Sequence, residues 1–124
     1  MSCWTKQVVL RLPAKVVGIW FPWEWERFEE EYFDRFRWEP GHIQPALCSK
    51  EKGYFIDYLL EEEEPVRYTD NEFDPVARPL TAAEKKLYLP AFQEFFPAFT
   101  LREMEDVHYC AYVWYNGTDA PYCY

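Results

Sequence analysis

Residues 107–115 read Val-His-Tyr-Cys-Ala-Tyr-Val-Trp-Tyr, and this stretch decides the expected fold. It is rich in aromatic and β-branched residues, which favour strands. The odd-numbered side chains would share one face of such a strand, and the even-numbered side chains the other. Both faces are bulky and largely apolar, so we expect this strand to lie inside a sheet rather than at its edge.

The residues that follow this stretch predict a hairpin. Asn116-Gly117 is the preferred pair for a type I′ turn. Residues 120–124 would then return as a short edge strand, the position in a sheet that tolerates Pro121.

Two helices are predicted upstream of residues 107–115. Residues 81–84, Thr-Ala-Ala-Glu, have the capping-box pattern of a helix start, and apolar residues at helical spacing continue to Phe96. Pro90 lies inside this pattern, so we expect a break or kink near Leu89.

The other predicted helix spans residues 22–37. Pro22 suits the first helical position, and acidic residues in the first turn and arginines in the last complement the helix dipole. An aromatic stripe with spacings of three and four predicts a buried face. Its members are Trp25, Phe28, Tyr32 and Phe36, with Phe33 expected to widen it.

Further strands are expected in the first half of the chain. Residues 6–12 read as a strand that ends at Pro13, and residues 15–20 as a short strand or an approach to the helix. Residues 42–48 and 53–60 predict a hairpin, with a helix as the alternative for 53–60. The glutamates after residue 60 and Pro65 should end this strand, and residues 65–80 should form a long loop.

This order of elements predicts a single α+β domain over residues 1–124. We expect an antiparallel sheet of about four to six strands with two main helices packed on one face.

Composition and charge limit the classes of partner. The 124-residue chain has a net charge of −9, and 21% of its residues are aromatic. The charge argues against binding to nucleic acid and to anionic membrane surfaces, and it favours a basic protein partner. A domain of this size cannot bury every aromatic side chain, so some Trp and Tyr should be exposed where they can anchor an interface.

The sequence also indicates a compartment. No apolar run reaches the roughly 20 residues that a membrane span requires, and the first residues lack the pattern of a signal peptide. We therefore expect a cytoplasmic protein with its four cysteines reduced and without a cofactor.

Motifs for catalysis or metal binding are weak. His42, Cys48, His108 and Cys110 are the candidate metal ligands, but no Cys-x-x-Cys pair is present. A cysteine nucleophile would have to pair with His108, without a recognisable oxyanion loop. The many acidic residues make any carboxylate pair weak evidence for acid–base chemistry. We expect neither a catalytic nor a metal site.

The strongest functional signal is an acidic segment that includes aromatic residues. Residues 61–74 hold seven acidic side chains against one arginine, which accounts for −6 of the net charge. Exposed aromatic anchors surrounded by steering charges are typical of tight interfaces. The predicted partner-binding residues are Glu61, Glu62, Glu63, Glu64, Tyr68, Asp70, Glu72, Phe73, Asp74 and, from the first helix, Trp23.

These features favour a small inhibitor of the immunity-protein type, which would neutralise a toxin or enzyme with a basic active site. One alternative is a phage-type anti-restriction or anti-CRISPR inhibitor that imitates the charge of nucleic acid. Others are a subunit or adaptor of a larger assembly and a small enzyme with a Cys/His or carboxylate site.

Overall fold

The computed structural model describes residues 4–37, 39–49, 53–66 and 76–115 of the chain. Its elements, in chain order, are β1 (Trp4–Pro13), the 3-10 helix η1 (Ala14–Val17), α1 (Pro22–Tyr32), the 3-10 helix η2 (Phe33–Arg35), β2 (Ile43–Ser49), β3 (Gly53–Val66), β4 (Val76–Pro79), α2 (Ala82–Phe95), α3 (Leu101–Met104) and β5 (His108–Tyr115).

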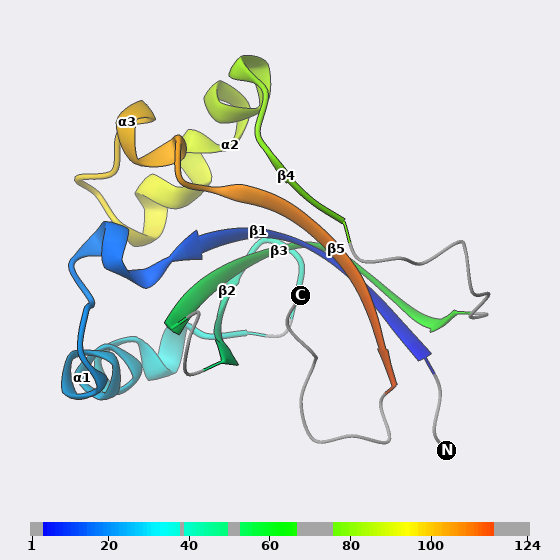
Figure 1. Ribbon diagram of the computed structural model, residues 1–124, viewed down its shortest axis with the longest axis horizontal. Helices are drawn as coiled ribbons and strands as arrows, with labels where there is room; N and C mark the ends of the chain where they lie inside the picture. The colour runs from blue at the N-terminus through cyan, green and yellow to red at the C-terminus, as the bar shows by residue number, and fades with distance from the viewer. Residues whose placement is uncertain (1–3, 38, 50–52, 67–75, 116–124) are drawn as a thin grey trace.

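The strands in the described ranges form one antiparallel sheet of five strands in the order β2-β3-β1-β5-β4 (Figure 1). β5 lies between β1 and β4, which confirms that it is an interior strand. β1 lies at the centre, and both of its faces are covered, since Val9 and Leu10 are each completely buried. The predicted return strand at residues 120–124 lies outside the described residues.

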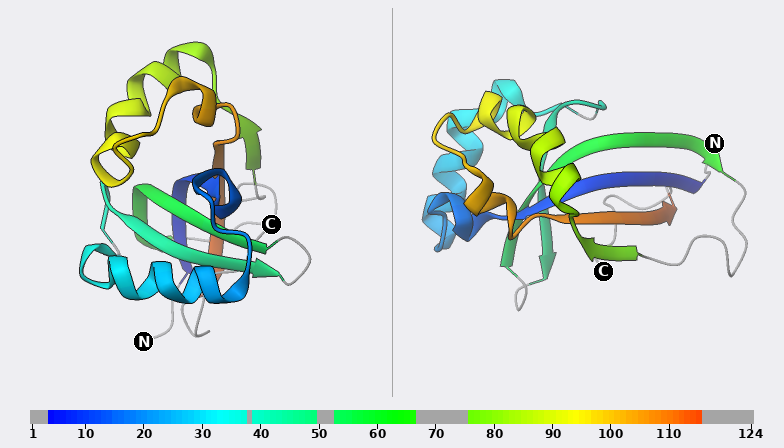
Figure 2. Two further views of the ribbon diagram at one scale, coloured as in Figure 1. Left: turned by 90° about the vertical axis from the view of Figure 1, so that its left-hand side faces the viewer. Right: turned by 90° about the horizontal axis from the view of Figure 1, so that it is seen from above.

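The two main helices share one face of the sheet, as the sequence predicts (Figure 2). A single aromatic-rich core joins them to the strands. Its larger members are Leu10, Leu12, Trp25, Phe28, Ile43, Ile56, Phe92, Phe95, Phe99 and Met104. Helices cover only one end of the sheet, and β3, β1 and β5 extend beyond them (Figure 2).

β3 is longer than predicted, because it continues through the four glutamates and Pro65 to Val66. The long β1 provides backbone hydrogen-bonding partners along this extension, in which Lys6 is the register partner of Glu63. Pro65 falls in a register shift between the pairs Trp4–Val66 and Lys6–Glu63, a position where a missing N–H is tolerated. The expected strand end after residue 60 is therefore wrong.

A second register shift, a β-bulge at Leu60, changes the direction of the acidic side chains. Val9 pairs with Leu59 and Val8 with Glu61, so Leu60 is the additional residue. Strand side chains alternate with a period of two, and one extra residue reverses the faces that follow it. Glu61 consequently lies on the helix-bearing face, across from Val8, and Glu62 on the opposite face.

The end of the predicted 65–80 loop is instead an edge strand. β4 pairs with β5 from Val76–Ala111 to Pro79–His108. Arg78 stabilises this edge, because its guanidinium forms two hydrogen bonds of 2.8 and 2.9 Å with Glu84 and lies 4.3 Å from the centre of the Tyr109 ring. Pro79 is compatible with the strand because β4 lies at the edge.

α2 begins as predicted and passes through Pro90 without a break. The Thr81 hydroxyl accepts a hydrogen bond from the Glu84 amide, and the Glu84 carboxylate accepts one from the Thr81 amide. Pro90 cannot donate a hydrogen bond to the carbonyl of Lys86, but both residues are exposed, so water can solvate that carbonyl.

α1 confirms most of its predicted aromatic stripe. Trp25 and Phe28 are buried, and Tyr32 and Phe36 are half-buried against the core. Phe33 was expected to widen the stripe, but its side chain is 75% exposed. The α-helix ends at Tyr32 and a 3-10 turn follows, which changes the direction of the next side chains.

The opposite face of the sheet holds a buried ion pair. Arg11 donates from Nε and Nη2 to the two oxygens of Asp57, at 2.9 and 2.8 Å. Asp57 is completely buried, and this pairing explains why an acidic residue lies in a strand of apolar residues. Burial raises the pKa of Asp57, and the hydrogen bonds from Arg11 oppose that rise.

Candidate protein-binding surface

The structure places only part of the predicted interface. Glu61 and Glu62 are exposed on the extension of β3, and the backbone of Glu63 and Glu64 continues the same strand. Five of the predicted residues lie outside the described part of the chain, and their role stays a prediction. They are Tyr68, Asp70, Glu72, Phe73 and Asp74.

Trp23 does not lie with the acidic strand. α1 occupies one end of the long axis of the molecule, and the end of β3 lies at the other (Figures 1 and 2). Trp23 is exposed as expected, but a compact partner site cannot readily include both regions. They are therefore two separate candidate surfaces.

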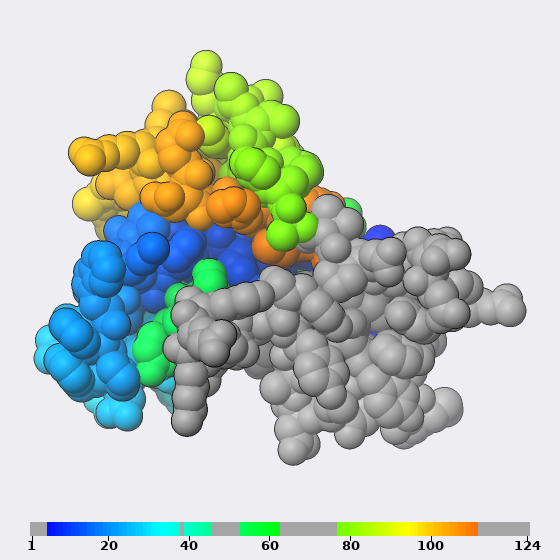
Figure 3. All heavy atoms as spheres, viewed as in Figure 1, coloured from blue at the N-terminus to red at the C-terminus, as the bar shows by residue number. Residues whose placement is uncertain are grey.

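The surface at the α1 end is an exposed aromatic cluster, which we define as Trp20, Phe21 and Trp23. Their side chains are 65%, 49% and 58% exposed. The rings of Phe21 and Trp23 stack with centroids 4.5 Å apart and planes only 5° from parallel. Figure 3 shows this segment in lighter blue at one end of the molecular surface. Large apolar side chains gathered in this way are a recurrent mark of interaction sites.

Local hydrogen bonds hold the aromatic cluster in place. The Glu24 carboxylate accepts bonds from the amides of Trp20 and Phe21, at 2.6 and 3.0 Å. Upstream, η1 ends at Val17 and is followed by Gly18, whose φ of 86° would be strained for a residue with a side chain, and the Ile19 amide donates to the Ala14 carbonyl. The aromatic side chains are thus presented by an ordered backbone, which reduces the entropy lost when a partner binds.

The helix next to the aromatic cluster is strongly acidic. Residues 22–35 carry six acidic side chains and two arginines, and hence a charge of −4. The sequence places Glu29, Glu30 and Glu31 around this helix, and the structure leaves all three exposed. Aromatic anchors and negative charge therefore meet on one surface in the described part of the molecule.

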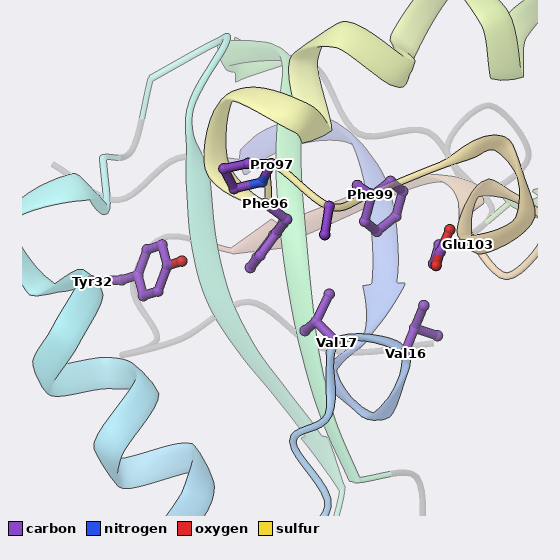
Figure 4. A pocket seen from close by; sticks show the side chains of 8 residues that line it. Val16, Val17, Tyr32, Phe96, Pro97, Phe99 and Glu103 are labelled. Atoms are coloured by element: carbon purple, nitrogen blue, oxygen red, sulfur yellow. The ribbon is translucent and has the colours of Figure 1, made fainter.

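Two adjoining hollows lie beside α1, of about 290 and 310 Å³. Both are lined by Val17 of η1, Tyr32 of α1 and Phe96, which follows α2. In Figure 4, Tyr32 lies at one end of the first hollow and Glu103 at the other, with Val16 and Val17 opposite Phe96 and Phe99. Sequence reasoning missed this feature because three segments distant in the chain form it.

The candidates for catalysis are not arranged as an activated pair. His108 and Cys110 lie on the same face of β5, as predicted, but His108 is exposed and Cys110 is buried. Burial raises the pKa of the Cys110 thiol, whereas a nucleophilic cysteine needs a lowered one. No group of three or more potential metal-ligating side chains occurs among the described residues.

The comparisons with known proteins leave the function to be argued from this geometry. No protein-family model matches the chain, and no curated protein or solved structure is similar enough to count as a match. Among the helices of the described ranges, none is both long and apolar enough to cross a membrane.

Proposed function

We propose that this chain is a protein-binding domain that recognises a basic partner protein. The aromatic cluster of Trp20, Phe21 and Trp23, which lies at the start of the acidic helix α1 and is held there by hydrogen bonds to Glu24, is the observation that supports this function most directly. Trp is among the residues that most often dominate binding energy, and flanking carboxylates accelerate the approach of a positively charged surface.

The most specific form of the proposal is an inhibitor of the immunity type that acts in the cytoplasm. Its acidic surface would cover the basic active site of a toxin or enzyme, and its aromatic side chains would fill apolar pockets at that site. Enzymes that act on nucleic acids or nucleotides carry such basic sites because their substrates are anionic.

A binding experiment tests the aromatic cluster. The wild-type protein is used to capture a partner from the cells in which it occurs, and the affinity for the purified partner is then measured. Trp20→Ala and Trp23→Ala should each weaken binding about 30-fold or more, because a buried aromatic anchor contributes at least about 2 kcal/mol. An inhibitor should also suppress the activity of the captured partner.

Phe33→Ala is the matched control, since Phe33 is an exposed aromatic residue at the other end of the α1 segment. Its affinity should equal that of the wild type, and all three variants should keep the wild-type thermal unfolding temperature. Unchanged affinity in both Trp variants would exclude the aromatic cluster as the interface.

The acidic segment at residues 61–74 needs its own arm in the same experiment. Charge reversal at Glu62, Glu64, Asp70 and Asp74 should slow association at low salt if this segment also steers the partner. A partner that belongs to restriction or CRISPR machinery would favour the charge-imitating inhibitor instead. For the small-enzyme alternative, an activity that is lost in Cys110→Ala or His108→Ala without unfolding would be the supporting result.

A further inference from the structure

The two hollows beside α1 form one depression with an apolar floor and an acidic rim. Val17, Tyr32 and Phe96 line both parts and are half-buried. The rim is formed by charged side chains, namely Glu24, Arg27, Glu31 and Glu103. Each hollow is at the lower limit of small-molecule pockets, so each part of the depression suits a single side chain better than a large ligand.

The carboxylates of the rim retain capacity to accept hydrogen bonds. Glu24 uses Oε2 for the amides of Trp20 and Phe21, and Glu103 uses Oε2 for the amide and the hydroxyl of Thr100. The side-chain hydrogen bonds that Glu24 and Glu103 form within the described ranges converge on Oε2, which leaves Oε1 of each carboxylate as the oxygen for a ligand. Three carboxylates against Arg27 give the rim a net negative charge.

One aromatic residue that lines the depression, Tyr32, already lies close to a guanidinium group. Arg35 lies 5.2 Å from the ring centre of Tyr32 and 4.8 Å from that of Phe95. Its Nη2 donates to the Glu94 carbonyl at 2.8 Å, which holds Arg35 in that position. The rings of Phe28 and Phe96, 6.2 Å apart, supply further aromatic surface next to the depression.

We propose that this depression is a subsite for an arginine side chain of the partner protein. This inference rests on the proposed function and names the chemistry of the contact. The methylene groups of the arginine would pack on Val17, its planar guanidinium would stack on Tyr32 or Phe96, and its N–H groups would donate to Glu24, Glu31 or Glu103. A lysine fits less well, because its ammonium group cannot stack as a plane.

A peptide titration tests the subsite without the natural partner. The probe is acetyl-Gly-Arg-Gly-amide, added to the full chain at low ionic strength while backbone amide shifts are followed by NMR. The amides of Val17, Tyr32 and Phe96 should shift and saturate. The matched citrulline peptide, which keeps the shape but lacks the charge, should not bind, and the lysine peptide should bind more weakly.

Three variants of α1 separate a specific contact from a general charge effect. Glu31→Gln should weaken binding of the arginine peptide about two- to fivefold, as expected for one partly exposed ion pair. Arg27→Gln should strengthen binding, because it removes the positive charge of the rim. Glu26→Gln, on the opposite side of α1, should leave binding unchanged.

The subsite would be overturned if the amides of Val17, Tyr32 and Phe96 showed no saturable shift, or if the citrulline peptide bound as well as the arginine peptide. Equal binding of the lysine peptide would overturn the assignment to arginine. These results are independent of the tryptophan variants. A failed titration leaves the aromatic cluster as an interface, and an unaffected tryptophan variant leaves the titration result in place.

Discussion

The two faces of the central strands are stabilised by different means. The helix-bearing face is filled with apolar and aromatic side chains, among them the completely buried Leu10, Ile56 and Phe92. On the other face of the same strands, Arg11 and Asp57 form a bidentate ion pair that is almost fully buried. Ile56 and Asp57 are sequence neighbours, so adjacent positions of one strand are stabilised by apolar packing on one face and by an ion pair on the other.

The difference concerns how each face tolerates change. Apolar contacts are many and individually weak, so their loss is gradual with the volume removed. A buried ion pair depends on both members, because either charge left alone in the interior is poorly compensated. On the ion-pair face, substitution of either charged residue should therefore remove most of the stability that the pair contributes. On the apolar face, the loss of stability should grow with the volume that is removed.

The largest expected effect is on the ion-pair face. Asp57→Ala removes the carboxylate that compensates the buried Arg11 guanidinium, and the free energy of unfolding should fall by about 3–5 kcal/mol. Urea denaturation measures this change. The double variant Arg11→Met with Asp57→Leu removes both charges and should recover most of the loss. A double variant as unstable as Asp57→Ala would contradict this account of the face.

The neighbouring position on the apolar face should give a smaller effect. Ile56→Val removes one methylene group from a completely buried site. The free energy of unfolding should fall by about 0.5–1.5 kcal/mol. The same denaturation experiment gives the comparison with Asp57→Ala directly. A loss as large as that of the ion-pair variant would show that both faces respond to the same degree.

The smallest effect is expected at the partly exposed ion pair of Arg78 and Glu84. Hydrogen bonds from Arg78 and from the Thr81 backbone lower the pKa of Glu84 from 4.5 to about 2. Because the folded pKa is the lower one, this contribution to stability is present above about pH 4.5 and is lost as the pH falls toward about 2.

Denaturation of the wild type and Glu84→Gln at several pH values measures this contribution. Gln keeps the shape and the capping role but does not titrate. The wild type should therefore lose more stability than Glu84→Gln over this acidic range, and the two should be similar at its lower end. Parallel pH profiles would contradict the assignment. Solvent screening makes this pair far weaker than its buried counterpart.

The sequence correctly predicted those features that depend on residues close together in the chain. The capping box of Thr81 and Glu84 marks the start of α2, and the aromatic spacing of α1 identifies Trp25 and Phe28 as buried. The exposure of Trp23 follows from its position off that stripe. In each case the signal is a spacing of three or four residues along a helix, so the sequence alone contains it.

Contacts between distant segments decided the rest. Asp57 is an unusual residue for an apolar strand, and its presence is explained only by the contact with Arg11, which is 46 residues away in the sequence. The extension of β3 through Pro65 depends on β1 as a pairing partner, and the bulge at Leu60 then sets the faces on which Glu61 and Glu62 lie.

The candidate sites divide along the same line. The sequence by itself determined that the chain is acidic, rich in aromatic residues and suited to an α+β domain, because composition and periodicity are properties of the chain. Only the tertiary structure separated Trp23 from the acidic strand and built a depression from η1, α1 and the residues after α2. Such a site depends on which distant segments pack together, and sequence spacing does not encode that proximity in a readable form.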